Sequence, residues 1–360
     1  MHGLLRSGRS FTDRNAMKAI VIHAPHDIRI DEWPVEAPGP GQVSVRIAAG
    51  GICGSDLHYY HQGGFGTVRI QHPMVLGHEI AGTVAAVGSG VTRVSVGDLV
   101  AVNPSVPCGR CRYCLEGMAN HCLDMRFYGS AMRTPHVHGG FREQLTCRED
   151  QMHLLPPGTD LTEAAFAEPL SVCLHAARQA GSLMGKRVLV SGCGPIGALC
   201  ALVARHGGAL EIVVTDLLDE PLAVVRRLGA DRVINMAAQP DGLAEYGKDK
   251  GTFDVVLEAS GAGPAVAAAA AAARPGAVII QVGIGGAETA VPLNTFVAKE
   301  LTLRGTFRFH EEFAWAVDFI TQRKIDVRPL LSAVLPLSEA RHAFDLASDR
   351  KQSMKVQVTF

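Results

Sequence analysis

Four cysteines close together form the most specific chemical signal in the sequence. They are spaced as Cys108-x2-Cys111-x2-Cys114-x7-Cys122, in a segment with loop-forming glycines. Four thiolates at this spacing can complete the tetrahedral coordination of zinc without ligands from elsewhere, which leaves no open position for a substrate. We therefore predict a structural zinc site here. Two disulfides, free thiols or an iron–sulfur cluster are the alternatives.

A second set of metal-type ligands precedes that loop. Taken alone, Cys53 would be a buried small side chain and His78 a packed core histidine. Beside another zinc motif they indicate a catalytic zinc, which needs a third ligand and keeps one position open for water or substrate. The candidates for that ligand are Glu79, next to His78, and Glu168, whose apolar surroundings require a cation to offset its desolvation.

A glycine-rich turn forms the third motif. Residues 192–197 read Gly-Cys-Gly-Pro-Ile-Gly, directly after a predicted strand at 187–191. The glycines permit a tight turn, leave room for a pyrophosphate and let the next helix approach the sheet. A carboxylate at Asp216, 19 positions past Gly197, can accept ribose hydroxyls and repels a 2′-phosphate, which favours NAD over NADP. The alternative is a glycine turn with a surface aspartate. The predicted cofactor-binding residues are Gly192, Gly194, Pro195, Ile196, Gly197 and Asp216.

The composition restricts the functional class. The chain has 360 residues, 47% hydrophobic and 19% charged, which fits about two globular domains. A formal net charge of −1 argues against a nucleic-acid or membrane surface. No apolar run reaches the ~18–20 residues that span a bilayer. Nine cysteines, an odd number without a visible secretion signal, favour reduced thiols, metal ligation and a cytoplasmic location.

Two different sequence patterns must position these motifs. Residues 17–165 contain short valine-rich stretches with frequent glycine and proline, which indicates a β-rich domain. Residues 166–304 alternate short β runs with helical segments, which is typical of a doubly wound parallel sheet. The strands are predicted at 187–191, 211–215, 253–258 and 277–282, and the helices at 168–180, 195–206, 220–228 and 263–273. Beyond 305 the pattern is irregular and ends in a strand at 355–360, so we expect the chain to return to the first domain.

The start of the chain is predicted to lie outside the fold. Met17 opens what reads as the first strand, so residues 1–16 are interpreted as an N-terminal extension, either a tag remnant or an upstream start. A transit-like segment is the alternative.

These motifs together resemble the medium-chain zinc alcohol and polyol dehydrogenases, from Met17 onward. The resemblance rests on residues 51–58 (Gly-Ile-Cys-Gly-Ser-Asp-Leu-His), 77–79 (Gly-His-Glu), the cysteine loop, 166–170 and 192–197. It implies a GroES-like β-rich catalytic domain, 17–165 with 305–360, and an inserted Rossmann domain, 166–304. It also implies two zinc ions per chain, a catalytic one held by Cys53, His78 and a glutamate, and NAD, with NADP as the alternative. Segments 50–60, 73–79, 103–105, 124–132, 135–141 and 306–309 are similar to members of the sorbitol dehydrogenase branch that act on a sugar acid.

The resemblance further implies a reaction. The expected activity is oxidation of L-idonate to 5-keto-D-gluconate by hydride transfer to the nicotinamide, with Ser55 and His58 passing the hydroxyl proton to solvent. Tyr59, Phe127 and Arg308 are candidate substrate contacts. Arg308 could bind the sugar-acid carboxylate with a bidentate fork, or instead contact cofactor or a neighbouring subunit. Sorbitol or xylitol dehydrogenase and L-threonine dehydrogenase are the alternatives, and a dimer or tetramer is expected from the family.

Overall fold

Six strands in the middle of the chain form one parallel sheet in the computed structural model, which describes residues 16–286 and 288–360. The strands are β13 (Arg187–Ser191), β14 (Glu211–Asp216), β15 (Arg232–Asn235), β16 (Phe253–Glu258), β17 (Ala273–Gln281) and β18 (Thr302–Gly305). They lie in the order β15-β14-β13-β16-β17-β18, and every neighbouring pair is parallel. This is the doubly wound order of a dinucleotide-binding sheet. The parallel sheet was predicted from four of these strands, and the two edge strands, β15 and β18, were not.

Helices accompany this sheet, as the alternation predicted. They are α4 (Ala167–Ala180), α5 (Pro195–His206), α6 (Asp219–Arg227), α7 (Gly263–Ala272) and α8 (Leu293–Lys299). The alanine-rich run forms α7, whose inner side buries Val266, Ala269 and Ala270. Strands covered on both faces must be apolar throughout, and the central residues of β13 and β16 are fully or almost fully buried.

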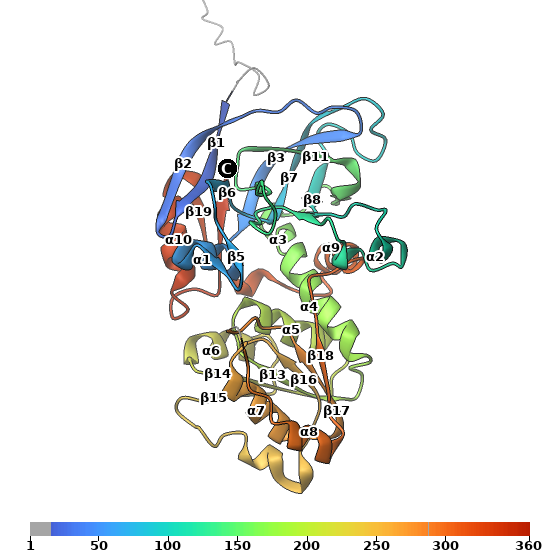
Figure 1. Ribbon diagram of the computed structural model, residues 1–360, viewed down its shortest axis with the longest axis vertical. Coiled ribbons are helices and arrows are strands. Elements are labelled where there is room, and N and C mark those ends of the chain that lie inside the picture. The colour runs from blue at the N-terminus through green and yellow to red at the C-terminus, as the bar shows by residue number, and fades with distance from the viewer. Residues whose placement is uncertain (1–15, 287) are drawn as a thin grey trace, which may run out of the picture.

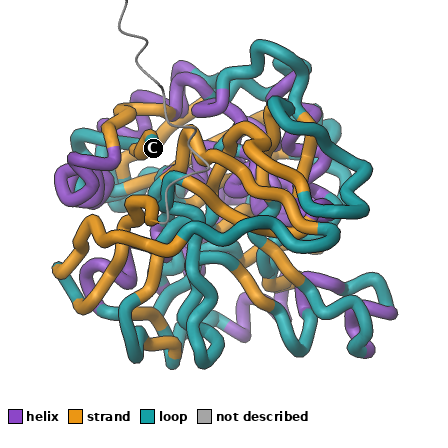
Figure 2. The backbone as a smooth tube through the Cα atoms, turned by 90° about the horizontal axis from the view of Figure 1, so that it is seen from above, coloured by secondary structure: helices purple, strands orange, loops and turns teal. Residues whose placement is uncertain are grey.

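The remaining strands build a second, mainly antiparallel half, which lies above the parallel sheet in Figure 1. Its largest sheet has the order β12-β8-β7-β3-β20-β19, with β11 also paired to β3. A three-stranded sheet has the order β2-β1-β6. Figure 2 shows that strands and long loops make up most of this end of the molecule. The strands of these two sheets are β1 (Ala16–Ala24), β2 (Asp27–Pro34), β3 (Gln42–Gly51), β6 (Met74–Val75), β7 (Glu79–Val87), β8 (Leu99–Val102), β11 (Gln144–Arg148), β12 (Met152–Leu154), β19 (Leu331–Pro336) and β20 (Lys355–Thr359).

Shorter elements connect the strands of this half. Three helices, α1 (Gly54–Gln62), α2 (Arg112–Leu115) and α3 (Leu161–Ala164), and four two-residue strands, β4 (Gly64–Phe65), β5 (Val68–Arg69), β9 (Ser105–Val106) and β10 (Arg126–Phe127), occupy these connections. Helix α4 then leads from this half to the parallel sheet and packs against α5 and the later helix α9 (Glu312–Thr321). Among the described residues, no helix is both long and apolar enough to cross a membrane.

The C-terminal segment returns to the β-rich half, as expected. Strand β20 pairs antiparallel with β3 and parallel with β19. The expectation of irregular structure beyond 305 is wrong in part, because the segment also forms α9 (Glu312–Thr321) and α10 (Ala340–Ser348). In α9 the buried Phe313, Ala316, Val317 and Ile320 recur at helical spacing, a period that was overlooked in the sequence.

We propose that the chain divides into 17–165 with 305–360 and 166–304. Among the described residues, no strand of the parallel sheet pairs with a strand of the other half. The predicted extension, 1–16, lies outside the described residues except for its last residue.

Candidate functional site

The pairing of β3 with β7 brings two separate motifs together. Gly51 ends β3 and lies opposite Glu79, which begins β7. Cys53, at the start of α1, and His78, directly before β7, are therefore close. One ligand atom from each of Cys53, His78 and Glu79 lies within 4.8 Å of the others.

Asp56 fixes the relative position of these two motifs. Its side chain is fully buried and accepts the Cys53 N–H at 3.0 Å and the Gly77 N–H at 3.2 Å. Its Oδ1 also lies 3.9 Å from Nδ1 of His78. Asp56 belongs to the 51–58 motif, but no role for it was predicted. The available signal was its place three residues after the candidate ligand at a helix start, where an acidic side chain caps the backbone.

The donor set fits a divalent cation. Nδ1 of the buried His78 has no hydrogen-bond partner among the described residues. Burial, and after it the Glu79 carboxylate, raises the pKa of Cys53 to about 12. A metal that binds thiolate, imidazole and carboxylate offsets the cost of that thiolate, and these ligand types are the ones that zinc takes. The group therefore fits a zinc site.

Lys355 neutralises the glutamate of this group and was missed from the sequence. Its Nζ lies 2.6 Å from Oε1 of Glu79 and donates to the Ile52 carbonyl at 3.0 Å. Both side chains are buried. Burial opposes the ammonium charge, but the nearby carboxylates outweigh it and the pKa of Lys355 is raised. No local pattern could have linked them, because β20 meets β3 only through the tertiary fold.

Glu168 faces the same region from the first turn of α4. It is buried but is not one of the three residues whose ligand atoms group together. Burial raises its pKa to about 8, while His78 lowers it and the charges of Glu79 and Cys53 raise it further. Glu79 therefore groups with Cys53 and His78, whereas Glu168 lies outside this group of three ligands. Glu168 is a nearby acidic side chain.

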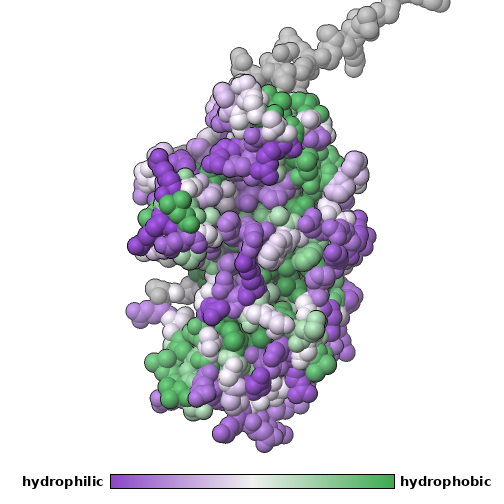
Figure 3. Space-filling model, turned by 90° about the vertical axis from the view of Figure 1, so that its right-hand side faces the viewer, coloured by the Kyte–Doolittle hydropathy of each residue, from purple (hydrophilic) through white to green (hydrophobic). Residues whose placement is uncertain are grey.

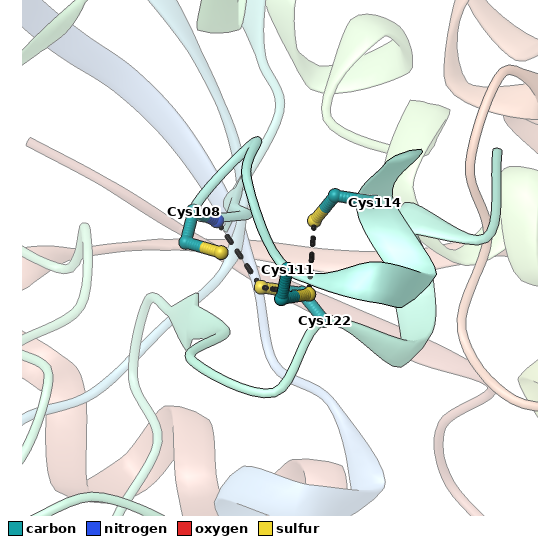
Figure 4. A group of neighbouring side chains, drawn as sticks. All are labelled: Cys108, Cys111, Cys114 and Cys122. Carbon is teal, nitrogen blue, oxygen red and sulfur yellow. Dashed lines mark hydrogen bonds between the residues drawn. The ribbon is translucent and has the colours of Figure 1, made fainter. Parts of the chain in front are cut away.

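The four cysteines of the predicted loop also converge (Figure 4). Sγ of Cys111 lies 3.6 Å from Sγ of Cys114 and 4.0 Å from Sγ of Cys122. A disulfide requires about 2.05 Å, whereas Zn–S bonds of about 2.3 Å in a tetrahedron place sulfurs about 3.8 Å apart. The N–H groups of Leu123 and Cys114 lower the pKa of Cys111 to about 6, which favours its thiolate. Burial raises the pKa of Cys114 to about 12, a cost that a bound metal would offset. The cluster fits the predicted structural zinc.

The glycine turn has the expected strand–turn–helix geometry. Gly192 has φ +88°, and a Cβ on Gly197 would lie 1.8 Å from the Gly192 carbonyl oxygen, so neither position accommodates a side chain. Gly194 caps α5 and has open space where a Cβ would lie, while Pro195 and Ile196 form the first turn of that helix. The free space and the helix N-terminus are suited to a pyrophosphate.

Asp216 lies beside this turn, as predicted, but its carboxylate is already occupied. Oδ2 accepts the Cys193 N–H at 2.6 Å, and Oδ1 accepts the N–H groups of Leu217 and Leu218 at 2.7 and 3.1 Å. Oδ2 also lies 2.7 Å from Nη2 of Arg350, a partner 134 positions away that no sequence motif predicted.

Two of the three predicted substrate contacts line one cavity of about 290 Å³. The Arg308 guanidinium carbon lies 4.1 Å from the centre of the Phe127 ring, which is 5.5 Å from the His78 ring. Arg308 has φ +54°, a strained backbone for a residue other than glycine. Tyr59 is not among the lining residues, and its hydroxyl accepts the Ala131 N–H at 2.9 Å. The cavity is lined by Asn120, His121, Cys122, Met125, Phe127, Ser130, Met132, Arg133, Val137, Phe307 and Arg308.

The proposed proton-relay residues both lie on α1. Ser55 is half-buried beside Cys53, and His58 is exposed. A separation of three residues places them on one side of the helix. The His58 ring contacts Phe65, with ring centres 5.9 Å apart.

Comparisons with known proteins agree with both halves of the structure. Residues 39–157 match the family described as alcohol dehydrogenase GroES-like domain, and residues 195–322 match the one described as zinc-binding dehydrogenase. L-idonate 5-dehydrogenase (NAD(P)(+)) of Escherichia coli strain K12 is 42% identical over 343 residues, 95% of this chain and 98% of that protein. Human sorbitol dehydrogenase is 35% identical over 332 residues, 91% of each chain.

Solved structures show the same relationship. The crystal structure of the Escherichia coli L-idonate 5-dehydrogenase has a TM-score of 0.92 and 42% identity, with 96% of this chain and 98% of that chain covered. Galactitol-1-phosphate dehydrogenase from Escherichia coli has a TM-score of 0.87 and 29% identity, with 96% of this chain and all of that chain covered. The fold is thus a GroES-like β domain joined to a Rossmann domain. The chain belongs to the zinc-dependent medium-chain dehydrogenases and is an NAD(P)-dependent enzyme of that family.

Proposed function

We propose that the enzyme oxidises a secondary hydroxyl of a sugar acid, L-idonate to 5-keto-D-gluconate. Two observations support this choice: the 42% identity to an L-idonate 5-dehydrogenase over nearly the whole chain and the charge of the substrate cavity. The cavity is the stronger support, because its residues are observed in this chain, whereas the identity only relates the chain to another protein.

The cavity is built for an anion. Arg308 and Arg133 both line it, and no carboxylate is among its lining residues. Arg133 donates to the main-chain carbonyl oxygens of Leu123 and Met125, and its Nη2 lies 4.0 Å from Oδ1 of Asp124. The guanidinium of Arg308 has only Met132 Sδ, a weak acceptor at 3.2 Å, within the described residues. Burial lowers the pKa of Arg308 to about 10 and the charge of Glu168 opposes this shift, so the cation persists at neutral pH. Among the described residues no carboxylate is hydrogen-bonded to it. A sugar-acid carboxylate would supply a strong partner.

The catalytic zinc would be held by Cys53, His78 and Glu79, with Glu168 close to these three residues. When bound, zinc and the nicotinamide would supply the chemistry of the step, an acidified substrate hydroxyl and a hydride acceptor. The chain's own residues orient the substrate and remove its proton. Phe127 and Arg308 would hold the sugar acid, with Tyr59 shaping the wall behind them.

The proton would leave along α1. Ser55 is half-buried and His58 exposed on the same side of this helix, so the pair leads from the metal group towards solvent. We propose Ser55 as the first proton acceptor and His58 as the group that exchanges the proton with water.

The dinucleotide would lie on the glycine turn. Gly192, Gly194, Pro195, Ile196 and Gly197 would surround the pyrophosphate, and Asp216 would face the adenosine ribose. These assignments are supported by the strand–turn–helix geometry around Gly194.

A homo-oligomer is part of the proposal. Strand β18 ends the parallel sheet, and all four of its residues are exposed. No described strand pairs with its outer edge, so this edge could join that of a second copy. Exposed apolar side chains on β18 and on the segment between β17 and β18 are Ile284, Leu293, Val297 and Leu303. Figure 3, which views the molecule from its right-hand side, shows hydrophobic surface on the lower half, where the parallel sheet lies.

We also propose a cytoplasmic location. It is supported by the nine cysteines, all of which lie outside disulfides.

Neutral polyols and L-threonine are the competing substrates. Sorbitol lacks a carboxylate for Arg308, and L-threonine carries an ammonium group for which the cavity lining offers no acidic partner. The test is the initial rates with L-idonate, sorbitol, xylitol and L-threonine. Arg308→Gln should raise the KM for L-idonate at least about tenfold, the loss of a charge-assisted hydrogen bond, and leave slow sorbitol oxidation unchanged. A native enzyme that prefers sorbitol would refute the assignment.

A further inference from the structure

An arginine from the C-terminal segment occupies the carboxylate predicted to select NAD. Arg350 lies between α10 and β20, in the β-rich half, and its Nη2 contacts Oδ2 of Asp216 at 2.7 Å at the end of β14. The Asp216 side chain is 4% exposed, whereas that of Arg350 is 48% exposed. The inner end of this ion pair is thus buried and its outer end open to solvent.

With Arg350 in place, the Asp216 carboxylate has no position left to accept a further hydrogen bond. A carboxylate offers about four lone-pair positions, and those of Asp216 face the N–H groups of Cys193, Leu217 and Leu218 together with Arg350. A ribose hydroxyl can use Asp216 only by displacing one of them. Arg350 is the single side chain of the four, and the one that can swing away.

The same pair changes how a 2′-phosphate is received. Alone, Asp216 would repel it, and Asp219 and Glu220 at the start of α6 add negative charge nearby. Arg350 neutralises Asp216, and within the described residues its Nε and Nη1 donate to no acceptor. These donors form part of the planar fork that binds phosphate oxygens.

We infer that Arg350 is the residue that admits the 2′-phosphate of NADP, and that the ratio of NADP to NAD use depends on it. This inference rests on the proposed dinucleotide site at the glycine turn. It departs from the sequence-based preference for NAD, which considered Asp216 without its partner. With NADP bound, the Arg350 guanidinium would bind the 2′-phosphate. With NAD bound, it would leave Asp216, whose carboxylate would then accept a ribose hydroxyl.

The test uses two fragments of the cofactors, 5′-AMP and 2′,5′-ADP, which differ by the 2′-phosphate. Their affinities for the zinc-loaded enzyme are measured by isothermal titration calorimetry, without substrate or turnover. Arg350→Ala should weaken 2′,5′-ADP at least about tenfold, the loss of a charge-assisted contact, and leave 5′-AMP equal or tighter. Arg350→Lys should retain part of the 2′,5′-ADP affinity. Lys351→Ala, an exposed neighbouring cation, should bind both like the native chain.

Four results would overturn the inference, the last of them together with the proposed dinucleotide site. Equal 2′,5′-ADP affinity in the native chain and Arg350→Ala would show that the arginine does not contact the phosphate. Equal weakening of both nucleotides would make Arg350 a structural contact only. A native enzyme that binds 5′-AMP but not 2′,5′-ADP would exclude NADP, whereas one that binds neither would remove the dinucleotide site itself.

Discussion

Replacing Lys355 with methionine tests whether its charge compensates Glu79. The Nζ–Oε1 distance of 2.6 Å corresponds to an attraction of about 6 kcal/mol at an effective dielectric constant of about 20. Desolvation of both groups opposes this attraction. Removing one partner of a buried pair typically costs about 3–5 kcal/mol, because the other charge is left uncompensated. We expect that loss in the free energy of unfolding of the metal-free Lys355→Met variant.

Zinc should remove most of this penalty. With the metal bound, the Glu79 carboxylate has a cation beside it, so Lys355→Met should cost far less in the zinc-loaded protein. In the chelated protein the Glu79 carboxylate has no such cation, so the full penalty should be seen there.

Urea-unfolding curves of chelated and zinc-loaded protein measure this difference. Lys351→Met, at an exposed lysine, is the matched control and should change neither curve. The double variant Glu79→Gln with Lys355→Met should recover stability in the chelated protein, because neither charge remains. A loss that is the same with and without zinc, or below about 1 kcal/mol, well under the expected range, would refute the proposed compensation.

Three further predictions concern the metal sites and the assembly. Cys53→Ser should reduce bound zinc from two ions to one per chain and abolish turnover. Cys111→Ser should lose the other ion and mainly lower the melting temperature. Metal analysis that finds two ions in Cys53→Ser would contradict the catalytic site. Because burial raises the pKa of Glu168 to about 8, its protonated form stabilises the metal-free fold at low pH, and that contribution falls as the pH rises from about 4.5 towards about 8. Glu168→Gln should flatten this dependence in chelated protein, and a profile identical to that of the native chain would count against the buried acid. Val297→Asp, on the apolar surface near β18, should shift the protein to monomers in sedimentation velocity, and an unchanged oligomer would place the interface elsewhere.

The sequence alone determined the motifs whose parts are contiguous in the chain. The cysteine spacing predicted a four-thiolate group, and residues 187–197 predicted the strand, turn and helix of the cofactor site within narrow bounds. Local geometry is sufficient in both cases, since a few backbone turns bring the side chains together. The alternation of strands and helices likewise predicted the parallel sheet. The spacing of apolar residues in each segment reflects which of its faces is buried, so it can be recognised locally.

Only the tertiary structure decided which distant residues complete each site. Pairing of β3 with β7 placed Cys53 beside His78 and Glu79 rather than Glu168. The return of the C-terminal segment brought Lys355 to Glu79 and Arg350 to Asp216, across 276 and 134 positions of the chain. No spacing rule predicts such contacts, because they follow from strand pairing and packing between the two halves. Lys355 and Arg350 change the net charge of the metal group and of the ribose site. The sequence therefore indicated the reaction, and the fold determined the charges around its metal and cofactor sites.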